Sequence, residues 1–136
     1  MPGKRLKKLT PQQERDLDIE IGFLECVVRR DPTYVDALLV LGDSYTRRGR
    51  FEEGLNVDKQ LSRLRPADAP AHYNLACSYS LTGRFESAAE ALNRALDLGY
   101  RDFDWLAKDP DLARLRKHSL YKKIRARIKA MAIKVL

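Results

Sequence analysis

The chain has 136 residues, and its 26 Lys and Arg against 19 Asp and Glu give a formal net charge of +7. With 44% apolar and 33% charged residues, it can build a core and is too evenly mixed for a fibrous or low-complexity protein. This length fits one domain. Two cysteines, Cys26 and Cys77, exclude a disulfide framework, and with two isolated histidines they give no metal-ligand spacing. We expect a reduced, intracellular protein without a cofactor or metal.

The charge is unevenly distributed along the chain. Residues 1–10 carry +4, residues 11–100 carry −4 and residues 101–136 carry +7. No apolar run approaches the roughly 18 residues of a membrane-spanning helix, and the basic start is not followed by the apolar segment of a secretory signal. The expected location is therefore the cytoplasm, and any polyanion contact would involve the two ends.

The first predicted element is a helix over residues 11–30. Thr10-Pro-Gln-Gln13 is a capping box with Pro at the first helical position, and Leu17, Ile21, Leu24 and Val28 follow at helical spacing. The helix should end before Asp31-Pro32. We expect residues 1–10 to form a mobile basic arm in front of it.

An internal repeat follows. Residues 35–66 match residues 69–100 at nine positions, including Gly49-Arg-Phe-Glu52 on Gly83-Arg-Phe-Glu86, against about two expected from background composition. In each copy a Leu and a Tyr four residues apart precede a turn glycine and a Phe that begins a second apolar pattern. Each copy therefore predicts a hairpin of two helices.

These residues resemble tetratricopeptide repeats. The positions that carry the resemblance are Leu38, Leu41-Gly42, Tyr45, Gly49, Phe51, Gly54, Asp58, Leu61 and Pro66, then His72, Leu75-Ala76, Tyr79, Gly83, Phe85, Ala88, Leu92, Ala95 and Tyr100. Asp58 departs from the pattern, which usually has a large apolar residue there. The resemblance implies an all-α solenoid of antiparallel helix hairpins, with repeats over 35–68 and 69–100, residues 11–30 as an N-terminal capping helix, and residues 11–136 as a single domain.

Residues 101–136 fall outside the repeat register and predict a basic C-terminal cap. Trp105 and Leu106 lie in a short helix or turn that fills the core, and Asp109-Pro110 is a cap signal for another. The segment resembles the Asp-Pro-Asp-Leu endings of some bacterial tetratricopeptide proteins. A last helix presents an apolar stripe and a basic face, the latter with Lys122, Lys123, Arg125, Arg127 and Lys129.

The resemblance also implies a function, because the first helices of such repeats line a concave groove that holds peptides. The corresponding residues here are Asp36, Leu39, Asp43, Arg47, Tyr73, Asn74, Cys77 and Leu81. Leu39, Tyr73 and Leu81 would supply apolar contact, and Asp43, Arg47 and Asn74 would orient the peptide. Cys77 also fits a small core residue. Family members that clamp a C-terminal carboxylate use Lys and Asn where this chain has Leu39 and Asp43, so we reject that clamp.

Two hypotheses follow. The first is a non-catalytic scaffold or adaptor, similar to a co-chaperone, that binds a partner peptide in the groove and has no small-molecule substrate. The second is a module that docks to nucleic acid, another polyanion or an anionic membrane through its basic ends, although the final basic helix also fits a simple cap. No catalytic set of residues shares a local frame. The apolar end helix could also stack on a second copy to give a homo-oligomer.

Overall fold

The computed structural model describes the backbone of residues 8–135 and the side chains of residues 8–133. The helices are α1 (Pro11–Arg30), α2 (Val35–Arg47), α3 (Phe51–Leu64), α4 (Ala69–Leu81), α5 (Phe85–Asp97), α6 (Phe103–Lys108), the 3-10 turn η2 (Pro110–Leu112), α7 (Ala113–Arg116) and α8 (Tyr121–Val135). No strand occurs within the described range. Residues 1–7 of the predicted arm lie outside it.

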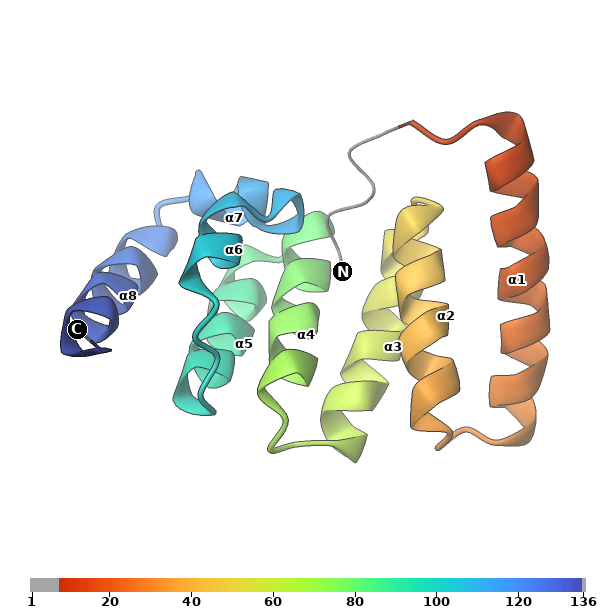
Figure 1. Ribbon diagram of the computed structural model, residues 1–136, viewed down its shortest axis with the longest axis horizontal. Helices are drawn as coiled ribbons and strands as arrows, with labels where there is room; N and C mark the ends of the chain where they lie inside the picture. The colour runs from red at the N-terminus through yellow and green to blue at the C-terminus, as the bar shows by residue number, and fades with distance from the viewer. Residues whose placement is uncertain (1–7, 136) are drawn as a thin grey trace.

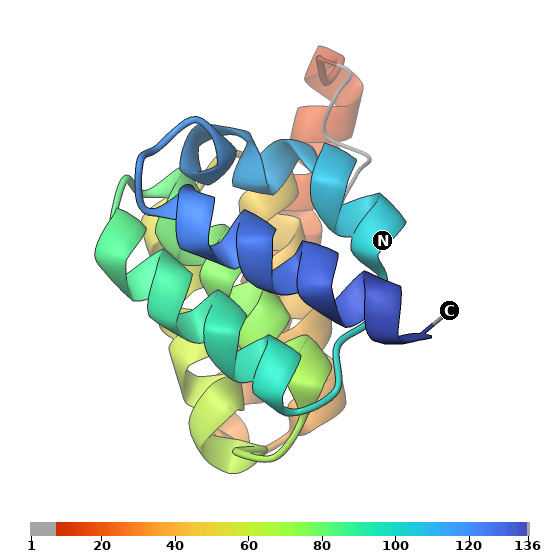
Figure 2. The same cartoon turned by 90° about the vertical axis from the view of Figure 1, so that its left-hand side faces the viewer.

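Helices α1 to α5 stand side by side in chain order, as Figure 1 shows. Helices α2 with α3 and α4 with α5 form the two hairpins, and α1 packs against α2 at one end of the row. At the other end, α8 lies alongside α5, as the turned view in Figure 2 shows. The predicted fold class, an all-α solenoid of antiparallel helix hairpins with a capping helix at each end, is confirmed.

Local signals set the helix ends. The Thr10 hydroxyl accepts a hydrogen bond from the Gln13 amide at 3.1 Å, and the Gln13 side chain accepts one from the Thr10 amide at 2.9 Å, which is the predicted capping box. Gly49 and Gly83 follow the last turns of α2 and α4 with φ of 84° and 75°. A side chain there would be strained, so the repeated glycine ends the first helix of each hairpin.

Two clusters of buried apolar side chains form the core. The smaller joins α1, α2 and α3 through Ile21, Leu38 and Leu61. The larger extends from Leu55 on α3 through α4 and α5 to Ile124 on α8. Because the larger cluster includes residues of both the second hairpin and the C-terminal cap, the position of the cap is fixed by the same burial that stabilises the hairpin.

Small residues bring the paired helices close together. An ideal Cβ at Gly42 on α2 would lie 3.2 Å from a methyl carbon of Val57, and one at Gly54 on α3 would lie 2.9 Å from the Thr46 hydroxyl. That hydroxyl donates to the Gly42 carbonyl at 2.9 Å and is therefore held in place. The glycines allow α2 and α3 to pack at this short separation.

Candidate functional site: a cavity between the first helices of the two hairpins

A cavity of about 190 Å³ lies between α2 and α4. Side chains and backbone from α2, α3, α4 and η2 line it: Leu39, Gly42, Asp43, Thr46, Asp58, Asn74, Cys77, Ser78, Leu81 and Asp111. The wall combines apolar side chains with carboxylates and a side-chain amide. Such a mixture can hold a ligand group by its apolar part and orient its polar end.

The sequence-predicted groove residues separate into two groups. Leu39, Asp43, Asn74, Cys77 and Leu81 line this cavity together. Asp36 is exposed in the first turn of α2, and Arg47 is half-buried at the far end of that helix, beside a second cavity that Lys8 and Leu9 also line. Tyr73 does not line either cavity.

Tyr73 is a correction to the predicted site. Its side chain is only 3% exposed, its ring stacks on Tyr100 with centroids 4.2 Å apart, and its hydroxyl donates to Asp109 Oδ2 at 2.6 Å. Burial raises the pKa of its hydroxyl above the usual range. The C-terminal cap covers the part of α4 that the repeat register assigned to the groove, so Tyr73 positions the cap instead of contacting a peptide.

Asp109 is the centre of the contact between α4 and η2. Its carboxylate is fully buried, accepts the Tyr73 hydroxyl and the Cys77 thiol, the latter at 3.7 Å, and accepts the Asp111 amide at 2.9 Å. The last bond is a helix N-cap, as the sequence Asp109-Pro110 predicts. We call Tyr73, Cys77 and Asp109 the cap latch.

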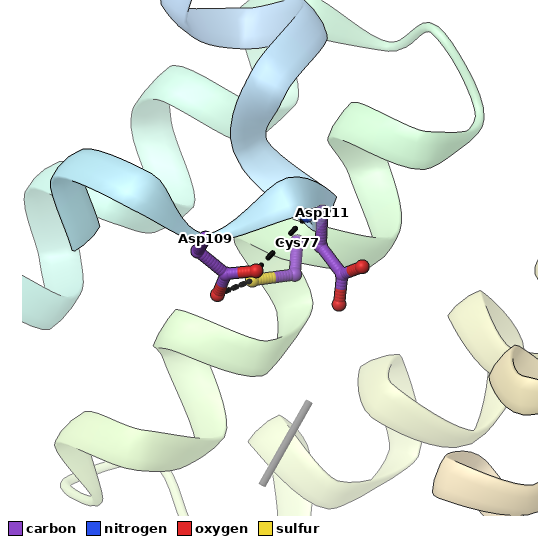
Figure 3. A group of neighbouring side chains, drawn as sticks. All are labelled: Cys77, Asp109 and Asp111. Carbon is purple, nitrogen blue, oxygen red and sulfur yellow. Dashed lines mark hydrogen bonds between the residues drawn. The ribbon is translucent and has the colours of Figure 1, made fainter. Parts of the chain in front are cut away.

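Figure 3 shows Cys77, Asp109 and Asp111 together. Their ligand atoms all lie within 4.8 Å of one another, close enough for one metal ion. Three hydrogen bonds to the Asp109 carboxylate, one of them from Cys77, already account for the arrangement. Burial and the neighbouring carboxylates raise the pKa of the Cys77 thiol, so this sulfur stays protonated and unreactive. We therefore assign the cluster a structural role.

Sequence reasoning missed Asp58 as a cavity residue. Its side chain, on α3, is 9% exposed, and Oδ2 accepts a short hydrogen bond from the Ser78 hydroxyl of α4. Burial raises the pKa of its carboxyl to about 6, with the Asp43 charge acting in the same direction and the Ser78 hydrogen bond opposing it. The signal was present in the sequence, because a carboxylate occupies a repeat position where a large apolar residue is usual.

The predicted basic surface lies on α8. Lys122, Lys123, Arg125 and Lys129 are exposed along it. Arg127 differs, since its guanidinium donates to the Asn93 side chain at 2.9 Å and pairs with Asp97. Arg127 therefore ties α8 to α5 and is a correction to the free basic face. None of the described helices is both long enough and apolar enough to cross a bilayer.

Comparison with known proteins supports the resemblance seen in the sequence. Residues 69–102 match the model of the tetratricopeptide repeat family. The chain is 38% identical over 79 residues to a chloroplastic protein of Arabidopsis thaliana, and the match covers 56% of this chain and 24% of that relative. It is 32% identical over 90 residues to the peroxisomal targeting signal receptor of Komagataella phaffii, covering 65% of this chain and 16% of the receptor.

The chain thus spans a quarter or less of the length of these relatives. Together with the helix hairpins, the match describes the fold as an all-α solenoid of the tetratricopeptide type. It also supports a role in protein–protein interaction, because this repeat family is generally a non-catalytic, protein-binding fold.

Proposed function

We propose that this protein is a non-catalytic adaptor that binds a peptide segment of a partner protein in the groove between α2 and α4. The observation that carries the proposal is the cavity itself, since Leu39, Asp43, Asn74 and Leu81 come together there from the first helices of both hairpins. One relative is named as a peroxisomal targeting signal receptor. That description is compatible with the same use of the groove here.

The test is affinity capture with a groove variant and a matched surface variant. Leu39→Ala with Asn74→Ala removes an apolar and a polar contact from the cavity wall. Glu90→Ala with Arg94→Ala changes two exposed residues of α5, a second helix of a hairpin that does not line the cavity. We expect the first variant to lose captured partners and the second to retain them. Equal capture by both variants would remove the support for a groove-binding function.

A second candidate is docking to a polyanion or an anionic membrane through the basic face of α8. The exposure of Lys122, Lys123, Arg125 and Lys129 favours it. Each neutralised phosphate releases counterions, so retention on heparin or DNA should fall steeply between low and moderate salt. Lys122→Ala with Lys123→Ala should reduce this retention. Weak retention of the unchanged protein at low salt would eliminate the candidate.

We also infer that residues 11–136 form one domain, because α3 contributes Leu61 to the cluster shared with α1 and α2 and Leu55 to the cluster that runs to α8. The cytoplasmic location and a homo-oligomer remain predictions. For the latter, Ile19 and Phe23 are the large apolar side chains exposed on α1.

A further inference from the structure

Asp58 occupies a core position of its repeat. The equivalent residue 34 positions later is Leu92, whose side chain is fully buried in the second hairpin. Asp58 is also nine-tenths buried, but it places a carboxylate where its counterpart places an apolar group. The Ser78 hydroxyl donates to Oδ2. Oδ1 receives no hydrogen bond from the described part of the chain, and the side chain lines the cavity between α2 and α4.

Burying a carboxylate at such a position is energetically unfavourable. Removing an ionised group from water costs several kcal/mol unless a counter-ion or several hydrogen bonds compensate it. The raised pKa of Asp58, about 6, reflects this cost. At neutral pH the group is still largely ionised, and one serine hydroxyl serves only one of its oxygens. A cation that entered the cavity would recover part of the lost hydration energy.

The rest of the cavity suits a cation on an aliphatic stem. Asp43 on α2 lines the same cavity and is exposed, and its charge acts on Asp58. Leu39, 46% exposed, and the half-buried Leu81 form apolar walls beside it, and Asn74 offers an amide oxygen. The described lining residues include no lysine or arginine. Lysine and arginine side chains combine a flexible hydrocarbon stem with a charged head, which matches these walls.

We propose that the partner segment in the groove carries a lysine or arginine whose side chain passes between Leu39 and Leu81 and places its cationic head against Asp58 and Asp43. The inference rests on the proposed peptide-binding function and names the chemistry of the bound segment. It also gives a reason for the charge distribution of the chain, whose residues 11–100 are net acidic although the whole chain is basic.

The experiment selects short random displayed peptides on the full-length protein and then measures dissociation constants for one selected peptide. That peptide is compared with versions in which each Lys or Arg is replaced in turn by norleucine, which keeps the stem and removes the charge. We expect one basic position to dominate the selection. Its replacement should weaken binding by about 10- to 100-fold, the range for a charge-assisted hydrogen bond.

Variants of the protein then locate the contact. Asp58→Asn should weaken the binding of the basic peptide by a similar factor and leave the binding of the norleucine peptide unchanged. Asp43→Asn changes an exposed residue, so it tests the same charge with no risk to folding. Glu90→Gln, on the exposed side of α5, is the control and should have no effect on either peptide.

The outcomes separate the two proposals. Peptides that bind, depend on Leu39 and Asn74, but carry no favoured basic residue would overturn this inference and leave the groove function standing. This inference would also be overturned if the basic peptide bound equally well to the unchanged protein and to the variants Asp58→Asn and Asp43→Asn. If no selected peptide is sensitive to Leu39→Ala with Asn74→Ala, the groove function fails, and this inference fails with it.

Discussion

Replacing Asp109 by Ala should destabilise the protein far more than replacing an exposed aspartate in the same role. Asp109 is fully buried, caps η2 through the Asp111 amide and accepts the Tyr73 hydroxyl at 2.6 Å. Loss of an N-cap costs about 1 kcal/mol, and loss of a hydrogen bond to a carboxylate costs about 2 kcal/mol. We therefore expect Asp109→Ala to lower the free energy of unfolding by about 3 kcal/mol, a large share of a typical domain's total.

Asp102 is the matched control because it also caps a helix of the C-terminal segment. Its side chain accepts from the Trp105 amide at 3.2 Å, but it is exposed and has no second partner among the described residues. Asp102→Ala should therefore cost only the cap, about 1 kcal/mol. Asp109→Asn, which keeps a cap acceptor and removes the charge, should fall between the two alanine variants.

The assay is urea denaturation followed by far-ultraviolet circular dichroism, together with the fluorescence of Trp105, the single tryptophan of the chain. A double-mutant cycle with Tyr73→Phe isolates the bond between Tyr73 and Asp109, and we expect a coupling energy of about 1–2 kcal/mol. If Asp109→Ala and Asp102→Ala cost the same to within about 0.5 kcal/mol, or if the cycle is additive, the cap latch does not hold the C-terminal segment as argued.

Three further outcomes follow from other parts of the structure. Gly22→Ala, on the open side of α1, should stabilise the protein by about 0.5–1 kcal/mol. Gly54→Ala should destabilise it by about 1–3 kcal/mol, because its Cβ would lie 2.9 Å from the Thr46 hydroxyl. Urea denaturation should therefore give changes in the free energy of unfolding of opposite sign for the two variants. Burial raises the pKa of Asp58 from 3.8 to about 6, so the folded protein holds a proton that the unfolded chain releases, and stability should fall as pH rises through this window and remain lower above it. Asp58→Asn, with Asp43, Cys77 and Asp111 still facing the cavity, should remove this component, and parallel pH profiles of the two proteins would contradict the assignment. A thiol reagent should modify the exposed Cys26 rapidly and the buried Cys77 only on unfolding. In the variant Cys26→Ser the labelling of Cys77 can be followed alone. If Cys77 there reacts as fast as Cys26 does in the unchanged protein, the cap opens readily.

The repeat pattern was sufficient to predict the two helix hairpins, and the family resemblance that its residues carry implied the solenoid. A helix face is defined by Leu41 and Tyr45, which are four residues apart, and the helix end is defined by the turn glycine Gly49. The second copy repeats both signals. These signals depend on neighbours within a few residues, so they can be read directly from the chain. The helix over 11–30 was predicted for the same reason, since Thr10 and Gln13 cap it through contacts three residues apart.

The candidate site was harder to predict because part of its wall comes from outside the register. The repeat register assigned Tyr73 to a concave surface, and no local signal shows that Asp109, 36 residues later, folds back to accept its hydroxyl. Asp111 lines the cavity through the same long-range docking. Asp58 was visible only as an exception to the apolar pattern, and its neighbour Ser78 comes from the next hairpin.

These long-range contacts make the C-terminal segment part of the groove. Asp109 anchors η2 to Tyr73 and Cys77 on α4, and Asp111, two residues further, lines the cavity together with Cys77. The cap therefore contributes to the wall of a groove that two hairpins alone would leave more open. The same segment also carries basic residues on α8, which packs on α5 through Arg127 and presents Lys122 and Lys123 to solvent. The carboxylates that line the groove and the exposed bases of α8 therefore lie on different elements of the chain, and the two surfaces can attract ligands of opposite charge.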